Sequence, residues 1–132
     1  MGRKVSLSEV PVDEIQYGRW QRLNGPLGIR AFGISAVSME PGDGADMTHD
    51  EADCGHQEVY VVISGRAAFQ LGDEQVEAGP GDVVSVPEPA ETRNYWALEP
   101  GTRIVCIGAE LVNEHPYGKW IAEEASSGGG GA

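Results

Sequence analysis

The chain has 132 residues, a formal net charge of −12 and a hydrophobic content of 40%. These values are typical of one soluble globular domain with a core of its own. The acidic surplus argues against nucleic acid as a partner, because phosphate would be repelled. The chain contains no apolar run of about 18 residues, the length needed to cross a membrane, so we expect no membrane partner. Cys54 and Cys106 are too few for a disulfide framework, and we expect two reduced thiols in a cytoplasmic protein.

Residues 1–28 are predicted to form an N-terminal arm. Arg19, Arg22 and the nearby Arg30 are its main positive charges, and they are available to an acidic surface or an anionic ligand. Seven short segments then combine β-branched and aromatic residues with Gly, Pro or Asp punctuation, which indicates strands. They are residues 29–39, 58–64, 66–71, 74–78, 82–87, 92–98 and 102–111. Gly72 and Asp73 predict a tight hairpin, since glycine tolerates the positive φ of such turns.

Short strands at regular intervals, without a long amphipathic helix, favour an antiparallel all-β sandwich or barrel over residues 29–111. Segment 58–64 has apolar side chains on both faces, which predicts burial on both sides, either by a second sheet or by a partner subunit. Residues 112–124 are predicted to pack over the barrel or onto a second subunit. The Gly- and Ser-rich residues 125–132 are predicted to be a flexible tail.

The segment from residue 58 to residue 89 resembles the centre of a small single-domain cupin. Cupins carry a first motif G-x5-H-x-H-x3,4-E-x6-G and a second motif G-x5-P-x-G-x2-H-x3-N. Glu58 and Gly65 match the E-x6-G part of the first motif, and Gly81 and Pro87 match the G-x5-P part of the second. The resemblance implies a double-stranded β-helix, or jelly-roll barrel, over residues 29–111 with N- and C-terminal arms. It also implies a homodimer.

The resemblance further implies a metal site of three histidines and one glutamate, which this chain keeps only in part. Glu58 stands at the glutamate position and His49 at the first histidine position. Glu51 replaces the second histidine, and Thr92 replaces the third. His56, two residues before Glu58, would share its face of the strand.

His49, His56 and Glu58, with Glu51 as a fourth ligand, could hold one divalent Fe, Mn, Ni or Zn ion. The alternative is a solvated loop without metal, because residues 40–58 include seven acidic side chains and no lysine or arginine. A calcium site is a third alternative, formed by the loop aspartates Asp43, Asp46, Asp50 and Asp53.

A small-molecule pocket is predicted beside the metal position. By the motif alignment, Thr92, Asn94 and Trp96 share the inward face of their strand, and with Tyr60 they would line this pocket. Arg93 and Tyr95 would then face outward or towards a partner. The alternative is that the aromatic residues belong to the core.

The two cysteines have different expected roles. Cys106 lies in an apolar run, which predicts a buried core thiol. Cys54 lies among carboxylates, which disfavour its thiolate form.

Two functions therefore stand beside each other. The first is a small metal-dependent cupin enzyme, in which the ion promotes an oxidation, isomerisation or lyase step. The second is a metal-free cupin that binds a small ligand as a sensor or carrier. Both have a small molecule as the ligand.

Overall fold

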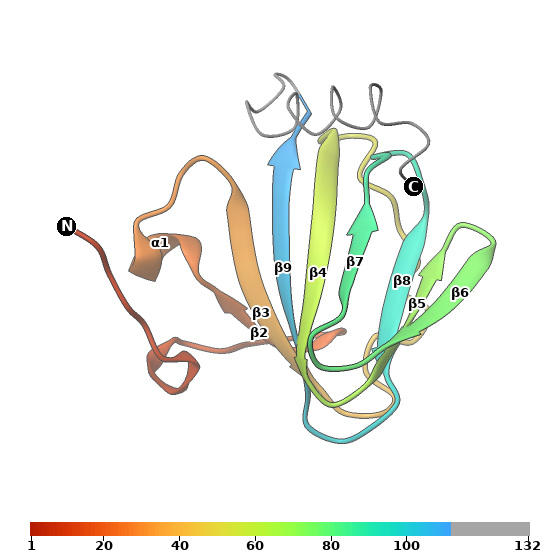
Figure 1. Ribbon diagram of the computed structural model, residues 1–132, viewed down its shortest axis with the longest axis horizontal. Helices are drawn as coiled ribbons and strands as arrows, with labels where there is room; N and C mark the ends of the chain where they lie inside the picture. The colour runs from red at the N-terminus through yellow and green to blue at the C-terminus, as the bar shows by residue number, and fades with distance from the viewer. Residues whose placement is uncertain (112–132) are drawn as a thin grey trace, which may run out of the picture.

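The computed structural model describes residues 1–111, which fold into two antiparallel β-sheets packed face to face (Figure 1). One sheet has six strands in the order β1–β2–β3–β9–β4–β7, and the other has three strands in the order β6–β5–β8. The expected all-β fold is confirmed. Within the described residues, no helix is long and apolar enough to span a membrane.

All strands are short, as the frequent turn residues predict. The six-stranded sheet consists of β1 (Asp13–Ile15), β2 (Gly18–Arg22), β3 (Gly33–Met39), β9 (Thr102–Glu110), β4 (His56–Ser64) and β7 (Val83–Val86). The three-stranded sheet consists of β6 (Glu74–Ala78), β5 (Ala67–Leu71) and β8 (Arg93–Ala97). A 3-10 helix, η1 (Leu7–Glu9), and the one-turn helix α1 (Asn24–Leu27) precede β3. Gly72, with φ of 58°, turns the chain between β5 and β6, which confirms the predicted hairpin.

The N-terminal residues take a larger part in the sheet than an arm would. They supply β1 and β2, and β2 pairs with β3 from Arg19 opposite Ser38 to Arg22 opposite Ser35. Their apolar residues also cover the outer face of the sheet, where Val10 and Leu23 pack on Ala36. The predicted packing segment 112–124 and tail 125–132 lie outside the described residues.

The main core lies between the two sheets. Tyr60 on β4, Phe69 on β5 and Tyr95 on β8 form its aromatic centre, with ring centroids 5.1–5.6 Å apart. Aliphatic residues from both sheets surround these rings, among them Val37, Val62, Val86 and Ile104. The aromatic centre therefore fixes the distance between the sheets and the depth to which the inner face of β4 is filled.

Gly65 allows the chain to pass from one sheet to the other. It follows β4 with φ of 72°, and a Cβ atom there would collide with the side chain of Thr102. The hydroxyl of Thr102 accepts a hydrogen bond from the backbone N–H of Arg66, the next residue, at 3.2 Å. The last glycine of the first cupin motif therefore has a local steric reason in this chain.

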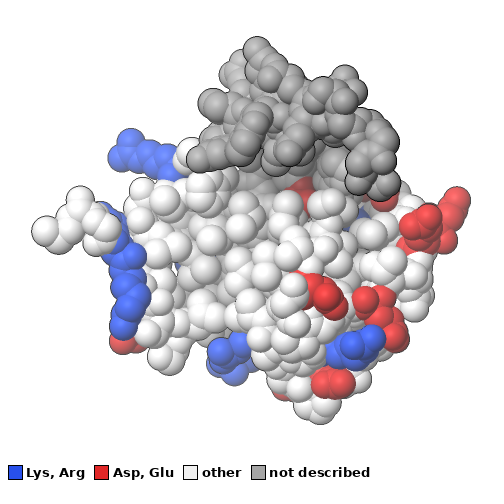
Figure 2. Space-filling model, in the orientation of Figure 1, with Lys and Arg blue, Asp and Glu red and all other residues white. Residues whose placement is uncertain are grey.

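The outer face of β4 and β7 is apolar and open. Ile63 is 44% exposed and Val83 is 62% exposed. Figure 2 shows a broad area over β9 and β4 that carries few charged side chains, whereas acidic side chains gather on the side of β5 and β6. The burial of β4 that its sequence predicts is thus present on the inner face and incomplete on the outer face of the described residues.

Candidate functional site

A cavity of about 520 Å³ opens on the inner face of the six-stranded sheet, where β4 begins and β9 ends. Its walls come from β2, β3, β4, β9 and the α1 region. The side chains that line it include Trp20, Arg22, Ser35, His56, Glu58 and Cys106. Apolar walls with a few polar groups, in a volume of this size, are typical of a small-molecule site.

The acidic loop before β4 is fixed against the start of β8. The backbones of His49 and Arg93 exchange two hydrogen bonds, of 3.0 Å and 2.7 Å, as in a short β-bridge. Two residues on, the N–H of Glu51 donates to the carbonyl of Pro89 at 2.8 Å. This segment of the loop is therefore anchored by backbone bonds, and its side chains are held close to the first residues of β4.

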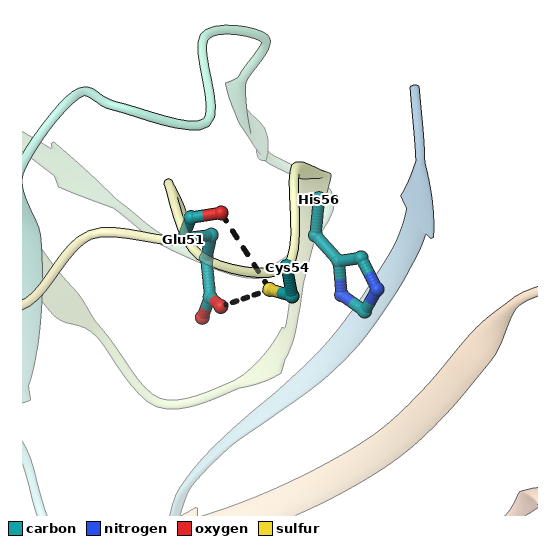
Figure 3. A group of neighbouring side chains, drawn as sticks. All are labelled: Glu51, Cys54 and His56. Carbon is teal, nitrogen blue, oxygen red and sulfur yellow. Dashed lines mark hydrogen bonds between the residues drawn. The ribbon is translucent and has the colours of Figure 1, made fainter. Parts of the chain in front are cut away.

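Two overlapping groups of metal-ligating side chains result. Glu51, Cys54 and His56 form the first group, drawn in Figure 3. His49, Glu51 and Glu58 form the second. In each group one ligand atom per residue lies within 4.8 Å of the others, a spacing that one ion could bridge after small side-chain rotations. Both groups share Glu51, and His56 also lines the cavity.

The imidazole of His49 is oriented as a metal ligand would be. Its Nδ1 lies 3.0 Å from the carbonyl oxygen of Met47, so an N–H there can donate to that carbonyl. Its Nε2 then faces Glu51 Oε1 at 3.3 Å. A lone pair on Nε2 would repel the carboxylate unless a cation lies between the two atoms, whereas a hydrogen on Nε2 can donate to it while Nδ1 accepts from the Tyr17 hydroxyl at 3.2 Å.

Glu58 is already bound by three donors of the protein. Arg93 Nη1 donates to its Oε1 at 2.7 Å, and the Tyr60 hydroxyl donates to the same oxygen at 2.9 Å. The Cys106 thiol donates to Oε2 at 3.3 Å. A cation bound to Glu58 would also lie beside the guanidinium charge of Arg93. The second group therefore fits a metal less well than the first, whose donors contact no arginine or lysine within the described residues.

Arg93 itself is 1% exposed and fully engaged. Besides Glu58, its guanidinium donates to three backbone carbonyls, those of Glu88, Pro89 and Glu91, at 2.8–3.2 Å. The β7–β8 connection therefore wraps around the guanidinium, and a positive charge is built into the inner end of the site.

Comparisons with known proteins agree with this architecture. The model of the Cupin domain family matches residues 36–104, which is more than half of the chain. The chain belongs to the cupin family. KdgF from Halomonas sp. is similar in structure, with 17% sequence identity over 86% of this chain and 97% of that chain and a TM-score of 0.68. The nucleoside dehydratase Pac13 from Streptomyces has 22% identity over 86% of each chain and a TM-score of 0.62.

One curated relative is similar in sequence over a shorter stretch. Acireductone dioxygenase from Exiguobacterium sibiricum is 34% identical to this cupin over 55 residues. The match covers 38% of this chain and 30% of that protein, so the chain spans less than a third of the relative's length. At these identities the solved structures establish the fold, and the sequence match is too short to transfer an activity.

The prediction for the faces of β8 was wrong. Arg93 and Tyr95 point inward, Arg93 to Glu58 and Tyr95 into the aromatic core. Arg93, one residue after Thr92, thus occupies the side of the site where a cupin would place its third histidine. Because side chains alternate along a strand, this shift by one residue exchanges the two faces.

The four predicted pocket residues are not brought together. Tyr60 is in the core, and only its hydroxyl reaches the site, through Glu58. Asn94 is buried beside Tyr17, and with Trp96 it lines a separate hollow of about 330 Å³ at the 42–46 turn. Thr92 is exposed at the start of β8. Among the described residues, the loop aspartates form no group that could hold calcium.

The hydroxyls and thiols of this cupin's site are held in their protonated forms. Burial raises the pKa of Tyr60, and burial together with the charge of Glu58 raises the pKa of Cys106. Cys106 was predicted to be a buried core thiol. It is instead half-buried and lines the cavity. A hydrogen bond to Glu51, of 2.9 Å, raises the pKa of the Cys54 thiol, in agreement with the expected effect of nearby carboxylates.

Sequence reasoning did not place Tyr17, Trp20 and Arg22 together at this site. Tyr17 places its hydroxyl 3.0 Å from the Met47 carbonyl and 3.2 Å from His49 Nδ1. Trp20 and Arg22 lie in β2, and the Arg22 guanidinium lies 5.4 Å from the centre of the Trp20 ring. The sequence indicates Arg22 only as a cation for an acidic surface or an anionic ligand. The alternation of side chains along residues 18–22 is the only sequence signal that could have placed Trp20 and Arg22 on the inner face.

Proposed function

We propose that this cupin binds a small organic molecule in the cavity between β2, β3, β4 and β9, beside a divalent transition-metal ion. Glu51, Cys54 and His56 would hold the ion. The observation that carries the proposal is the position of His56, which belongs to the first ligand group and also lines the cavity. An ion at His56 would therefore face the bound molecule.

The donor set suits an ion of intermediate softness. One imidazole, one carboxylate and one thiolate are ligands that zinc accepts, and iron or manganese would favour the carboxylate and imidazole. The thiol of Cys54 now donates its proton to Glu51, so metal binding at this group would release that proton. When bound, the ion would act as a Lewis acid towards an oxygen of the molecule in the cavity.

The remaining residues would position the molecule and keep the site electrically balanced. Glu58 is neutralised by Arg93, so it adds no net negative charge to the cavity. The hydroxyl of Ser35 and the thiol of Cys106 are polar groups of the cavity wall. They can orient a ligand through hydrogen bonds.

The proposed chemistry is an oxidation, an isomerisation or an elimination on the bound molecule. Two similar proteins are named as a dioxygenase and a nucleoside dehydratase, and both names describe chemistry on small molecules. These names support a small-molecule substrate for this chain. The reaction itself depends on the ion and on the functional groups of that substrate.

Metal titration of the chelator-treated chain with Zn²⁺, Mn²⁺ and Fe²⁺, followed by calorimetry and native mass spectrometry, tests the proposal. We expect one ion per chain, and at least a tenfold loss of affinity in His56→Ala and in Cys54→Ser. His49→Ala is the matched control, because it removes a ligand of the second group only and should weaken binding less. If His56→Ala and Cys54→Ser bound the metal ion as tightly as His49→Ala, the assignment of His56 and Cys54 as metal ligands would be wrong.

The metal-free binder is the second candidate, and the ion pair between Arg93 and Glu58 favours it. In this reading the guanidinium provides the positive charge that a metal provides in other cupins. Ligand binding would then be unchanged by chelator, and the His56→Ala variant would show no loss of metal because wild type holds none.

We also propose a homodimer through the apolar outer face of β4 and β7. The exposure of Ile63 and Val83 supports it, because an open apolar sheet face favours burial against a second copy.

A further inference from the structure

The floor of the cavity has no side chains where two strands meet. Gly33 on β3 is the register partner of Gly108 on β9, and Gly108 is the partner of Glu58 on β4. Cross-strand partners point to the same face of a sheet, so all three positions face the cavity. Two adjacent positions of this row therefore expose only backbone.

The backbone does not require glycine at Gly33, whereas a Cβ atom at Gly108 would make tight contacts. Neither glycine has a φ in the left-handed range that favours glycine. A Cβ atom at Gly33 would lie 3.5 Å from the Gly108 carbonyl oxygen, which is an ordinary contact. At Gly108 the nearest atoms would be Gln57 O at 3.3 Å and Glu58 Cγ at 3.4 Å. Glycine inside a strand is less stable than alanine by about 0.5–1 kcal/mol and often marks a place where another group comes close to the backbone.

The walls around this floor are of two kinds. Trp20 stands on the β2 side with a large aromatic surface, and the guanidinium of Arg22 lies over its ring. His56 stands on the β4 side together with Glu58, whereas Ser35 on β3 is the register partner of Arg22 and lies on the β2 side. One side of the cavity is thus aromatic, and the other offers hydrogen-bond donors and acceptors.

We propose that the cavity selects a flat aromatic or heteroaromatic ring. The ring lies with one face on the Gly33–Gly108 backbone, next to Trp20, and turns a polar edge towards His56. A puckered ring of the same size is thicker and cannot approach the floor over its whole area. This inference rests on the proposed use of the cavity for a small molecule, and it adds the chemical class of that molecule.

Calorimetry of the full chain with two matched probes tests the inference. The probes are 2-naphthol, which is flat, and decahydro-2-naphthol, which has the same hydroxyl on a puckered skeleton. Chelator is present throughout, so that metal binding does not contribute. We expect 2-naphthol to bind at least tenfold more tightly than its saturated analogue.

Gly33→Ala locates the binding on the floor. The added methyl group enters the cavity without a backbone clash, so we expect at least a tenfold loss of 2-naphthol affinity with an unchanged or higher melting temperature. Gly79→Ala is the control, because Gly79 lies outside the cavity and a Cβ there meets only the flexible end of Arg66 at 3.4 Å. It should leave the affinity unchanged.

The other outcomes separate this inference from the function on which it rests. Equal binding of both probes, lost in Gly33→Ala, would overturn the preference for a flat ring and leave the small-molecule cavity in place. Binding of 2-naphthol that Gly33→Ala does not change would overturn the assignment to the floor. Absence of binding by both probes would overturn the inference, while the metal titration still decides the ion site.

Discussion

Replacement of Arg93 by methionine should expose the energetic role of the buried ion pair. The side chain is 1% exposed and donates to Glu58 at 2.7 Å and to three backbone carbonyls. Methionine fills a similar volume but leaves the Glu58 carboxylate without its cation. Breaking a buried pair in this way costs about 3–5 kcal/mol. For a domain of this size we expect the melting temperature to fall by roughly 10–20 °C.

Chemical denaturation of a double-mutant cycle is the assay. Addition of Glu58→Gln to Arg93→Met removes the uncompensated charge, so the double variant should be more stable than Arg93→Met alone. Arg66→Met is a matched control, because Arg66 forms an exposed ion pair with Glu77 at 3.2 Å. Its loss should cost less than about 1 kcal/mol. An Arg93→Met variant within about 1 kcal/mol of wild type would refute the reasoning that Arg93 and Glu58 form a structural pair.

Three further predictions follow from local contacts. The raised pKa of Cys54 lowers its thiolate fraction, so iodoacetamide should modify it slowly at about pH 8, and Glu51→Ala should speed the reaction measured by mass spectrometry; an unchanged rate would contradict the hydrogen bond. Gly65→Ala should lower the free energy of unfolding in urea by at least about 2 kcal/mol. Gly81→Ala should lower it less, because Gly81 also has a positive φ but no atom lies within 4 Å of an added Cβ. Val83→Lys should convert a dimer to a monomer in analytical ultracentrifugation, whereas a wild-type monomer would rule out the proposed homodimer.

The sequence predicts the parts of this protein that depend on short segments. Strand composition and turn residues are local properties, and they were enough for the all-β fold and for the hairpin at Gly72. The spacing from Glu58 to Gly65, together with that from Gly81 to Pro87, was enough to recognise the cupin family, because Glu58 lies near the start of the inner face of β4 and Gly65 directly follows the strand. His56 and Glu58 share a face because they are two residues apart.

The tertiary structure alone decided which groups meet across strands. Arg93 reaches Glu58, 35 residues away, because Arg93 and not Thr92 is the first side chain of β8 that points inward. A shift of one residue along a strand moves every side chain to the opposite face of the sheet. Trp20 and Arg22 reach the cavity because β2 pairs with β3, and no local pattern specifies that pairing. The ligand groups, the neutralised glutamate and the glycine floor all depend on register between strands distant in sequence, which is set by packing of the whole core.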